Sequence, residues 1–349
     1  MIKVLLVAIT FFVQAPAFEV DSTLTETEAV SIALENSFDI KLEKYNMEIA
    51  KNNNTLGNAG FLPTVEANAS TNKTIQDTEL EFASGDGQSR DGAESTSTNA
   101  GVSLNWTIFD GLRMFATKER LEQIEQSNSY TLKARIQNTI SDVLKAFYNA
   151  GLEQERLRLL RSNLELSVER VQISKDKYEI GKASKLEYLQ AQVDYNTDQS
   201  SYVKQQEVIA VRLYELQRVL GLIEASDSLT LDFSYDLDLV MSREQAEDLA
   251  LTQNPDLQTM QLSREVSIMA TKELERARLP SLDFNMGYNY AKSEAEAGFV
   301  LQNQSNGLNY GLSANITLFD GMNQSRQIQN ARLQAEYAQT SFDRSKTIL

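Results

Sequence analysis

Residues 101–111 read G-V-S-L-N-W-T-I-F-D-G, and residues 311–321 repeat this stretch as G-L-S-A-N-I-T-L-F-D-G. In both copies apolar residues alternate with small polar ones, which predicts a strand with one apolar and one polar face. Both copies then reach F-D-G and change to a helical pattern, with Asp110–Gly111 and Asp320–Gly321 at the junctions. We expect Asp110 and Asp320 to cap the first free N–H groups of the two helices. The chain therefore contains the same strand-to-helix unit twice.

A second repeated feature precedes each of these units. Thr25-x-x-Glu28 and Ser242-x-x-Gln245 lie 217 residues apart, and both predict a capping box at the start of a helix. Pro63 and Pro280 have the same separation, and each follows a leucine. Proline lacks an N–H group, so we expect each helix to end there, the first one covering 24–63. We interpret the chain as an internal duplication, with repeats at 18–220 and 241–349 and a linker or belt at 221–240.

Each proline introduces a predicted β-hairpin, at 64–109 and at 281–319. We expect strands of about ten residues, the length of a tilted membrane strand, joined by solvent loops at 75–98 and 291–307. Four strands cannot close a barrel, and open strand edges are not stable in lipid, so several copies would have to share one barrel. Half of a soluble sandwich is the alternative. Aromatic residues near the ends of the apolar face would form a membrane girdle: Trp106, Phe109, Tyr288, Tyr290, Tyr310 and Phe319.

The helical pattern after the first F-D-G continues over 111–180 without a proline. Such a helix would be roughly 100 Å long, and its three–four apolar spacing indicates coiled-coil packing. Gly181 predicts the turn, and Ser184-x-x-Glu187 predicts a capping box for a return helix over 184–220. The second repeat begins the same helix at 321–349 and stops early. We expect a truncated second repeat that could not make a closed duct as it stands, with a naturally asymmetric protein as the alternative.

Composition excludes several classes of function. The net charge of −16 argues against a nucleic-acid partner, because phosphate binding needs basic surfaces. Histidine and cysteine are absent, and we find no phosphate-binding loop, nucleophile elbow or metal-ligand spacing, so we expect neither an enzyme nor a cofactor. Residues 1–17 have the lysine, the short apolar run and the A-P-A ending of an export signal peptide, with a buried N-terminal helix as the alternative.

These features together resemble the TolC-like outer-membrane efflux proteins. The resemblance rests on the two Leu-Pro junctions, the two F-D-G junctions and the motif Tyr178-x-x-Gly181-x-x-Ser184-x-x-Glu187-x-Leu189-x-Ala191. It implies a homotrimer in the outer membrane with one twelve-stranded barrel and a helical tunnel reaching into the periplasm. It also implies a helical tip that meets the periplasmic adaptor of an inner-membrane pump. The adaptor-facing residues would be Ile180, Gly181, Ser184, Glu187 and Leu189.

Two functions follow from this reading. The first is a passive outer-membrane duct for efflux or type I secretion, in contact with outer-membrane lipid and gated at the helical tips. The second is a non-conducting coiled-coil protein, structural or adhesive, held in the membrane by its strands. The sequence names neither the exported substrate nor any gate residue.

Overall fold

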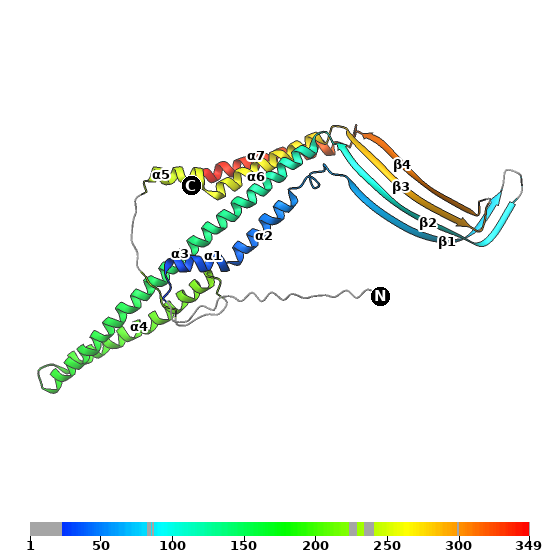
Figure 1. Cartoon of the computed structure of the whole chain (residues 1–349). Helices are drawn as coiled ribbons and strands as arrows, with labels where there is room; N and C mark the ends of the chain where they lie inside the picture. The colour runs from blue at the N-terminus through cyan, green and yellow to red at the C-terminus, as the bar shows by residue number, and fades with distance from the viewer. Residues whose placement is uncertain are drawn as a thin grey trace. The chain divides into compact units, whose positions relative to one another are not determined.

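The computed structural model describes residues 23–81, 85, 87–222, 229–233, 241–298 and 300–348 (Figure 1). The predicted signal peptide at 1–17 and most of the predicted linker at 221–240 lie outside the described residues. The chain divides into two compact units. The helical unit is Met1–Leu42 with Arg135–Val240, and the sheet unit is Glu43–Ala134 with Met241–Leu349.

The described elements are mainly helical, with four strands, as the sequence predicts. None of the described helices is long and apolar enough to cross a membrane. In chain order the elements are α1 (Glu26–Asn36), α2 (Phe38–Asn53), β1 (Thr64–Glu81), β2 (Gly87–Phe109), α3 (Arg113–Glu179), α4 (Lys185–Val219), α5 (Arg243–Gln253), α6 (Pro255–Arg276), β3 (Ser281–Ala295), β4 (Gln302–Asn315) and α7 (Asn323–Ile348).

In the helical unit, α1 and α4 pack on α3 around one apolar cluster. Its largest fully buried side chains include Val143 and Phe147 of α3 and Leu216 of α4. The described part of the predicted belt joins this core, because Leu231 pairs with Leu24 in a parallel bridge. The amide of Gln154 adds two bonds to the backbone of Leu231, 3.1 and 3.2 Å long. The belt is therefore fixed to the segment just before α1 and to α3.

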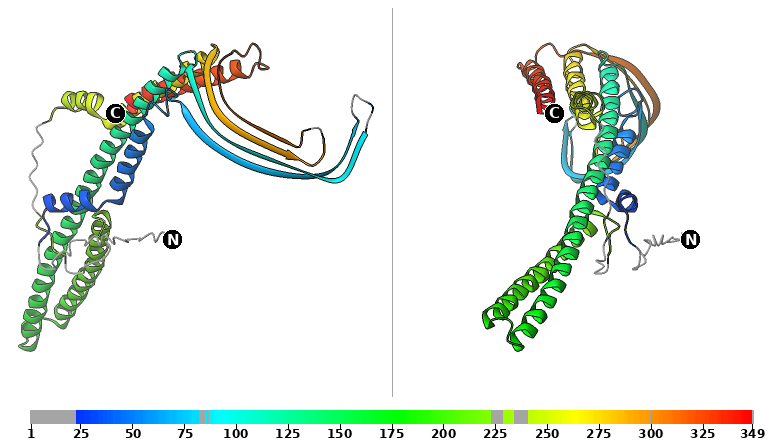
Figure 2. Two further views of the ribbon diagram at one scale, coloured as in Figure 1. Left: turned by 45° about the vertical axis from the view of Figure 1, so that its right-hand side comes forward. Right: turned by 90° about the vertical axis from the view of Figure 1, so that its left-hand side faces the viewer.

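The sheet unit contains one antiparallel sheet in the order β1-β2-β3-β4, curved along its strands (Figure 2). The strands have 18, 23, 15 and 14 residues, longer than predicted. The prediction of solvent loops at 75–98 and 291–307 is wrong, because most of these residues are paired in strands. Cross-strand ion pairs such as Lys73–Glu94, at 2.6 Å, join the extended parts. Pairing between backbones makes these segments strands, although their Gly, Ser and acidic residues are typical of loops.

The two repeats share a helix break that the sequence analysis missed. The prediction of a single helix over 24–63 is wrong, because the helix is interrupted at Ser37. The helix of the second copy is interrupted at the equivalent Asn254. Ser37 Oγ accepts from the N–H of Ile40 at 3.3 Å, and Asn254 Oδ1 accepts from that of Leu257 at 3.2 Å. Each side chain caps a new helix where the apolar pattern alone continues.

The two prolines have a different local role from the one predicted. Helix α2 ends at Asn53 and α6 at Arg276, so neither helix reaches its proline. Pro63 and Pro280 instead stand directly before β1 and β3. They mark equivalent starts of strands, because proline favours extended backbone in the residue before it.

The strand-to-helix turns are the same in both copies. Gly111 and Leu112 have φ of 72° and 68°, and the equivalent Gly321 and Met322 have 69° and 67°. Such left-handed pairs turn the backbone from strand to helix within two residues and are costly for side chains other than glycine. The capping prediction is confirmed: Asp110 Oδ1 accepts from the N–H of Met114 at 3.1 Å, and Asp320 Oδ2 from that of Gln324 at 2.7 Å.

Three helical segments lie together in the sheet unit. Helix α6 runs beside α7 (Figure 1), and Glu275 of α6 accepts from Arg332 of α7 at 2.6 Å. On the N-terminal part of α3, Arg120 forms an ion pair with Glu273 of α6 at 2.7 Å. Both members of this pair are largely covered, so it fixes α6 against α3 more firmly than an exposed pair would.

Candidate functional site

The predicted tip is the hairpin between α3 and α4. Gly181 has φ of 72°, and no atom lies within 4 Å of the position its Cβ would take. The N–H of Gly181 donates to Tyr178 O at 3.0 Å, and that of Lys182 donates to Lys177 O at 2.8 Å. These two bonds are those of a Schellman motif, which satisfies the last carbonyl groups of α3. The turn predicted at Gly181 is confirmed.

Helix α4 begins at the predicted cap, but the capping box is incomplete. Ser184 Oγ accepts from the N–H of Glu187 at 3.2 Å, as an N-cap side chain should. The carboxylate of Glu187 accepts from the Ser184 hydroxyl at 3.4 Å. At Thr25 and Ser242 the reciprocal bond to the cap's backbone N–H is present as well. The start of α4 is therefore less firmly capped than those of α1 and α5.

Large apolar side chains are exposed around this turn. Ile180 is 65% exposed, Leu186 is 74% exposed and Leu189 is 45% exposed. Tyr178 of α3 and Tyr188 of α4 stack across the hairpin, with ring centroids 6.2 Å apart and planes 8° from parallel. The stack joins the two helix ends, and the three aliphatic side chains remain available to a partner.

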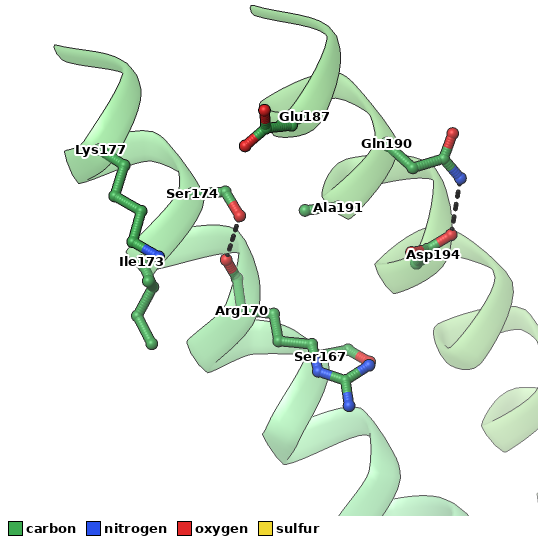
Figure 3. A pocket seen from close by; sticks show the side chains of 9 residues that line it. All are labelled: Ser167, Arg170, Ile173, Ser174, Lys177, Glu187, Gln190, Ala191 and Asp194. Atoms are coloured by element: carbon green, nitrogen blue, oxygen red, sulfur yellow. Dashed lines mark hydrogen bonds between the residues drawn. The ribbon is translucent and has the colours of Figure 1, made fainter. Parts of the chain in front are cut away.

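A cavity of 370 Å³ opens between α3 and α4 beside the tip (Figure 3). The α3 side contributes the cations Arg170 and Lys177, and the α4 side contributes the carboxylates of Glu187 and Asp194. Ser174 and Gln190 are held by bonds to Arg170 O and Asp194, at 2.7 and 2.9 Å. The remaining lining residues are Ser167, Ile173 and Ala191.

This cavity joins one predicted tip residue, Glu187, to residues that the sequence analysis missed. The spacing of Arg170, Ser174 and Lys177 places them on one face of α3, and Glu187, Gln190 and Asp194 share one face of α4. The sequence shows that spacing, but it does not show that these two faces lie against each other. The mixture of charges can bind polar groups of a partner. Among the described residues, no group of three or more acidic side chains is placed to hold a metal ion.

The register of the sheet produces two unlike faces. Val65, Leu104, Met286 and Tyr310 form one row across all four strands, and the next row is Ala67, Val102, Tyr288 and Leu308. Most of these large side chains are exposed, Tyr310 to 74%. We call this side the apolar face. A contiguous apolar surface of this kind marks contact with lipid or with another protein.

The opposite side, which we call the polar face, consists mainly of amides, hydroxyls and glycines. One row is Asn68, Gly101, Asn289 and Gly307, and the next is Glu66, Ser103, Gly287 and Asn309. Asn289 donates to Asn309 at 2.9 Å across β3 and β4. A Cβ at Gly101 would lie 2.5 Å from Oδ1 of Asn289, so the glycine makes room for the amide. This face suits contact with water.

The predicted aromatic girdle is only partly within the sheet. Tyr288, Tyr290 and Tyr310 lie on the apolar face, and Trp106 Nε1 donates to Phe61 O at 3.0 Å. Phe109 joins that face through a bulge at residue 108, which pairs it with Leu282. The expected hairpin boundary at 319 is wrong, because β4 ends at Asn315 and Phe319 lies beyond it. The bulge in β2 and the end of β4 depend on pairing with the neighbouring strand. The alternation of residues along one strand does not determine that pairing.

Among the residues that the structure describes, the two outer edges of the sheet have no further strand partner. β1 and β4 each have one hydrogen-bonded neighbour, since the order is β1-β2-β3-β4. Each therefore presents a row of backbone N–H and C=O groups for pairing with another strand.

Comparison with known proteins supports the architecture. AprF of Pseudomonas aeruginosa, an alkaline protease secretion protein, is 22% identical over 294 residues, which cover 83% of this chain and 60% of that protein. CyaE of Bordetella pertussis is 23% identical over 251 residues, 70% of this chain and 52% of that protein. The chain thus spans between about half and three fifths of the length of these relatives.

The fold itself matches solved structures. The CmeC outer membrane channel of Campylobacter jejuni superimposes with a TM-score of 0.73 at 18% identity, over 95% of this chain and 72% of that chain. The family model described as "outer membrane efflux protein" matches residues 29–222, more than half of the sequence. The resemblance drawn from the F-D-G and Leu-Pro junctions is confirmed. The chain belongs to the outer membrane efflux protein family.

Proposed function

We propose that this protein is an outer-membrane channel through which molecules leave the cell passively, with its sheet in the membrane and its helices in the periplasm. Several copies would close one barrel, the apolar faces toward lipid and the polar faces toward a water-filled lumen. Small molecules and secreted proteins are both candidates for the exported substrate. The protein-secretion relative AprF supports the second.

The observation that supports this proposal most strongly is the combination of unlike faces and open edges in the same sheet. An apolar face that stayed in water would promote aggregation. Open edges in lipid would leave backbone groups without hydrogen bonds. Pairing β1 of one copy with β4 of the next would satisfy the open edges, and contact of the apolar faces with lipid would remove them from water. The relation is heterologous, so it must close into a ring.

The height of the apolar face fits a membrane. On β3 it extends from Leu282 to Tyr290. At about 3.4 Å per residue this distance is roughly 27 Å along the strand. A strand tilted by about 40° would cover roughly 20 Å of membrane, close to the apolar band of about 25 Å on outer-membrane barrels. Beyond Tyr290 the same side becomes charged, starting with Lys292 and Glu294.

Family resemblance supports a trimer that works with a periplasmic adaptor and an inner-membrane pump. The exposed Ile180, Leu186 and Leu189 at the α3–α4 tip would supply the apolar contact for the adaptor. The adjoining cavity would accept polar groups of the same partner. Burial of these three aliphatic side chains against a partner would stabilise the contact through the hydrophobic effect.

Single-channel recording in planar bilayers tests the proposal. We expect discrete, long-lived conductance steps from the purified full-length protein. A control with a charged residue at the middle of the apolar band, Met286→Arg, should insert much less readily, because a cation at mid-membrane costs about 2–4 kcal/mol. Protein that inserts into bilayers without any conductance step would instead support the non-conducting, structural reading.

A further inference from the structure

We propose that Glu66 determines the preference of the channel for cations. The inference rests on the proposed function, since it requires the polar face to line a conducting lumen. The proposal gives the carboxylate of Glu66, near the start of β1, a role in ion selectivity.

The polar face has almost no charge. Along the polar side of the paired rows, from the row of Thr107, Asp283 and Ser313 to the row of Gln76 and Ala93, the described side chains include two ionisable ones, Glu66 and Asp283. Lys73 and Lys292, which lie in the same part of the sheet, alternate onto the apolar side. No cation of the described sheet therefore offsets the two carboxylates within these rows.

The two carboxylates differ in what surrounds them. Asp283 accepts from Thr107 at 2.7 Å, from Ser281 at 3.1 Å and from Asn315 at 3.4 Å. Three donors partly neutralise its field and hold its oxygens against the sheet. Glu66 is exposed, and within the described part of the chain its carboxylate has neither a hydrogen bond nor an ion pair. Its charge is therefore the one directed into open solvent.

The position of Glu66 in the sheet strengthens this effect. Its row continues through Ser103 to Gly287, which has no side chain to cover the carboxylate. Glu66 also lies on β1, an edge strand. In an assembly of identical copies one such carboxylate would come from each copy, at one level of the barrel, and so form a ring. Rings of acidic side chains favour cations over anions in pores.

Reversal potentials across a potassium chloride gradient test the proposal. We expect the unaltered channel to prefer potassium to chloride, and Glu66→Gln to reduce the permeability ratio at least about twofold near 0.01 M salt, where the Debye length is about 30 Å. Near 1 M salt the Debye length is about 3 Å, so the two channels should differ little. Glu294→Gln is the matched control, because it removes the same charge from the apolar side, where Glu294 pairs with Lys292 at 2.6 Å.

A second variant tests the charge inside an assembled channel. The chain has no cysteine, so Glu66→Cys introduces a single thiol. Modification with a sulfonate-bearing thiosulfonate should restore cation preference, and an ammonium-bearing reagent should reverse it, in the same inserted channel. This measurement does not depend on whether the charge substitution alters folding.

The possible outcomes separate the two proposals. If the protein inserts and never conducts, the channel function and the role of Glu66 are both overturned. If it conducts normally and neither Glu66→Gln nor thiol modification changes the permeability ratio, the channel function stands and the role of Glu66 is overturned. An equal change in the Glu294→Gln channel would also overturn it, because the effect would then not belong to the polar face.

Discussion

The ring of Phe233 lies directly on Gly151 of α3, where a Cβ atom would overlap three atoms of the ring. Phe233 also meets Tyr148 edge-on, with ring centroids 6.0 Å apart. The glycine is therefore needed in mid-helix because the belt crosses α3 at that point.

Gly151→Ala should destabilise the protein, although alanine is the better helix former by about 1 kcal/mol. Overpacking at such a contact costs about 1–3 kcal/mol, so we expect a net loss and a lower thermal midpoint in detergent. Ser162→Ala, at an exposed position of α3, is the control and should leave the midpoint unchanged or raise it slightly. An increase in stability for Gly151→Ala would show that the belt does not press on α3.

The capping box of α1 should be sensitive to acid, and that of α5 should not. The backbone N–H of Thr25 and then its hydroxyl donate to the Glu28 carboxylate, and both bonds lower the pKa of Glu28 from its ordinary value. A lower pKa in the folded state means that the bond stabilises the helix start above the unfolded-state pKa. That contribution disappears as the pH falls through the folded-state pKa. In α5 the neutral Gln245 occupies the same position.

Hydrogen exchange measured between pH 7 and pH 3 tests this difference. The Thr25 amide should lose protection relative to the Ser242 amide as the pH falls, after correction for the intrinsic exchange rate. Glu28→Gln should make the two amides respond alike. Equal loss of protection at both sites in the unaltered protein would contradict the prediction.

Gly181→Ala should loosen the α3–α4 tip by roughly 1–2 kcal/mol, the cost of left-handed backbone for a residue with a Cβ. Since no atom lies within 4 Å of that Cβ position, the cost would come from the backbone alone. Gly181→Asn should be tolerated better, because asparagine adopts this conformation more readily. Faster exchange of the Gly181 and Lys182 amides would report the loss of the Schellman bonds, and equal exchange in both variants would contradict a backbone origin.

Two glycines on the polar face should respond oppositely to alanine. At Gly101 a Cβ would lie 2.5 Å from Asn289 Oδ1 and 3.3 Å from Asn68 Oδ1, so Gly101→Ala should displace Asn289 and weaken its bond to Asn309. At Gly307, in the same row, nothing lies within 4 Å. Gly307→Ala should therefore be neutral or stabilising by a few tenths to about 1 kcal/mol.

The temperature at which the assembled protein dissociates on a denaturing gel would distinguish these variants. We expect a lower temperature for Gly101→Ala, partly recovered by adding Asn289→Ala, which removes the obstructing amide. If Gly101→Ala and Gly307→Ala behaved alike, the packing of the amides against glycine would not matter for stability.

The extended parts of the strands show where reasoning from the sequence fails. Residues 87–98 are rich in Gly, Ser, Asp and Glu and have no apolar alternation, so they suggest a loop. In the structure they pair with β1, and Arg90 reaches from β2 to Glu296, with an ion pair of 3.1 Å and a bond to its backbone oxygen of 2.9 Å. Strand pairing and ion pairs hold this region together, with Ala93 as its one buried described side chain, and pattern analysis cannot detect such contacts.

By itself the sequence determined what depends on neighbours along the chain: the duplication, the two faces of the strand at 101–109, the caps at Thr25, Asp110 and Ser242, and the turn at Gly181. Such features need only a few consecutive residues, because capping and alternation act over one turn or a few residues. The tertiary structure alone decided the register of the sheet, the bulge at residue 108 and the cavity between Arg170 and Asp194. Each of these brings together residues far apart in the chain, and their positions depend on how whole strands and helices pair.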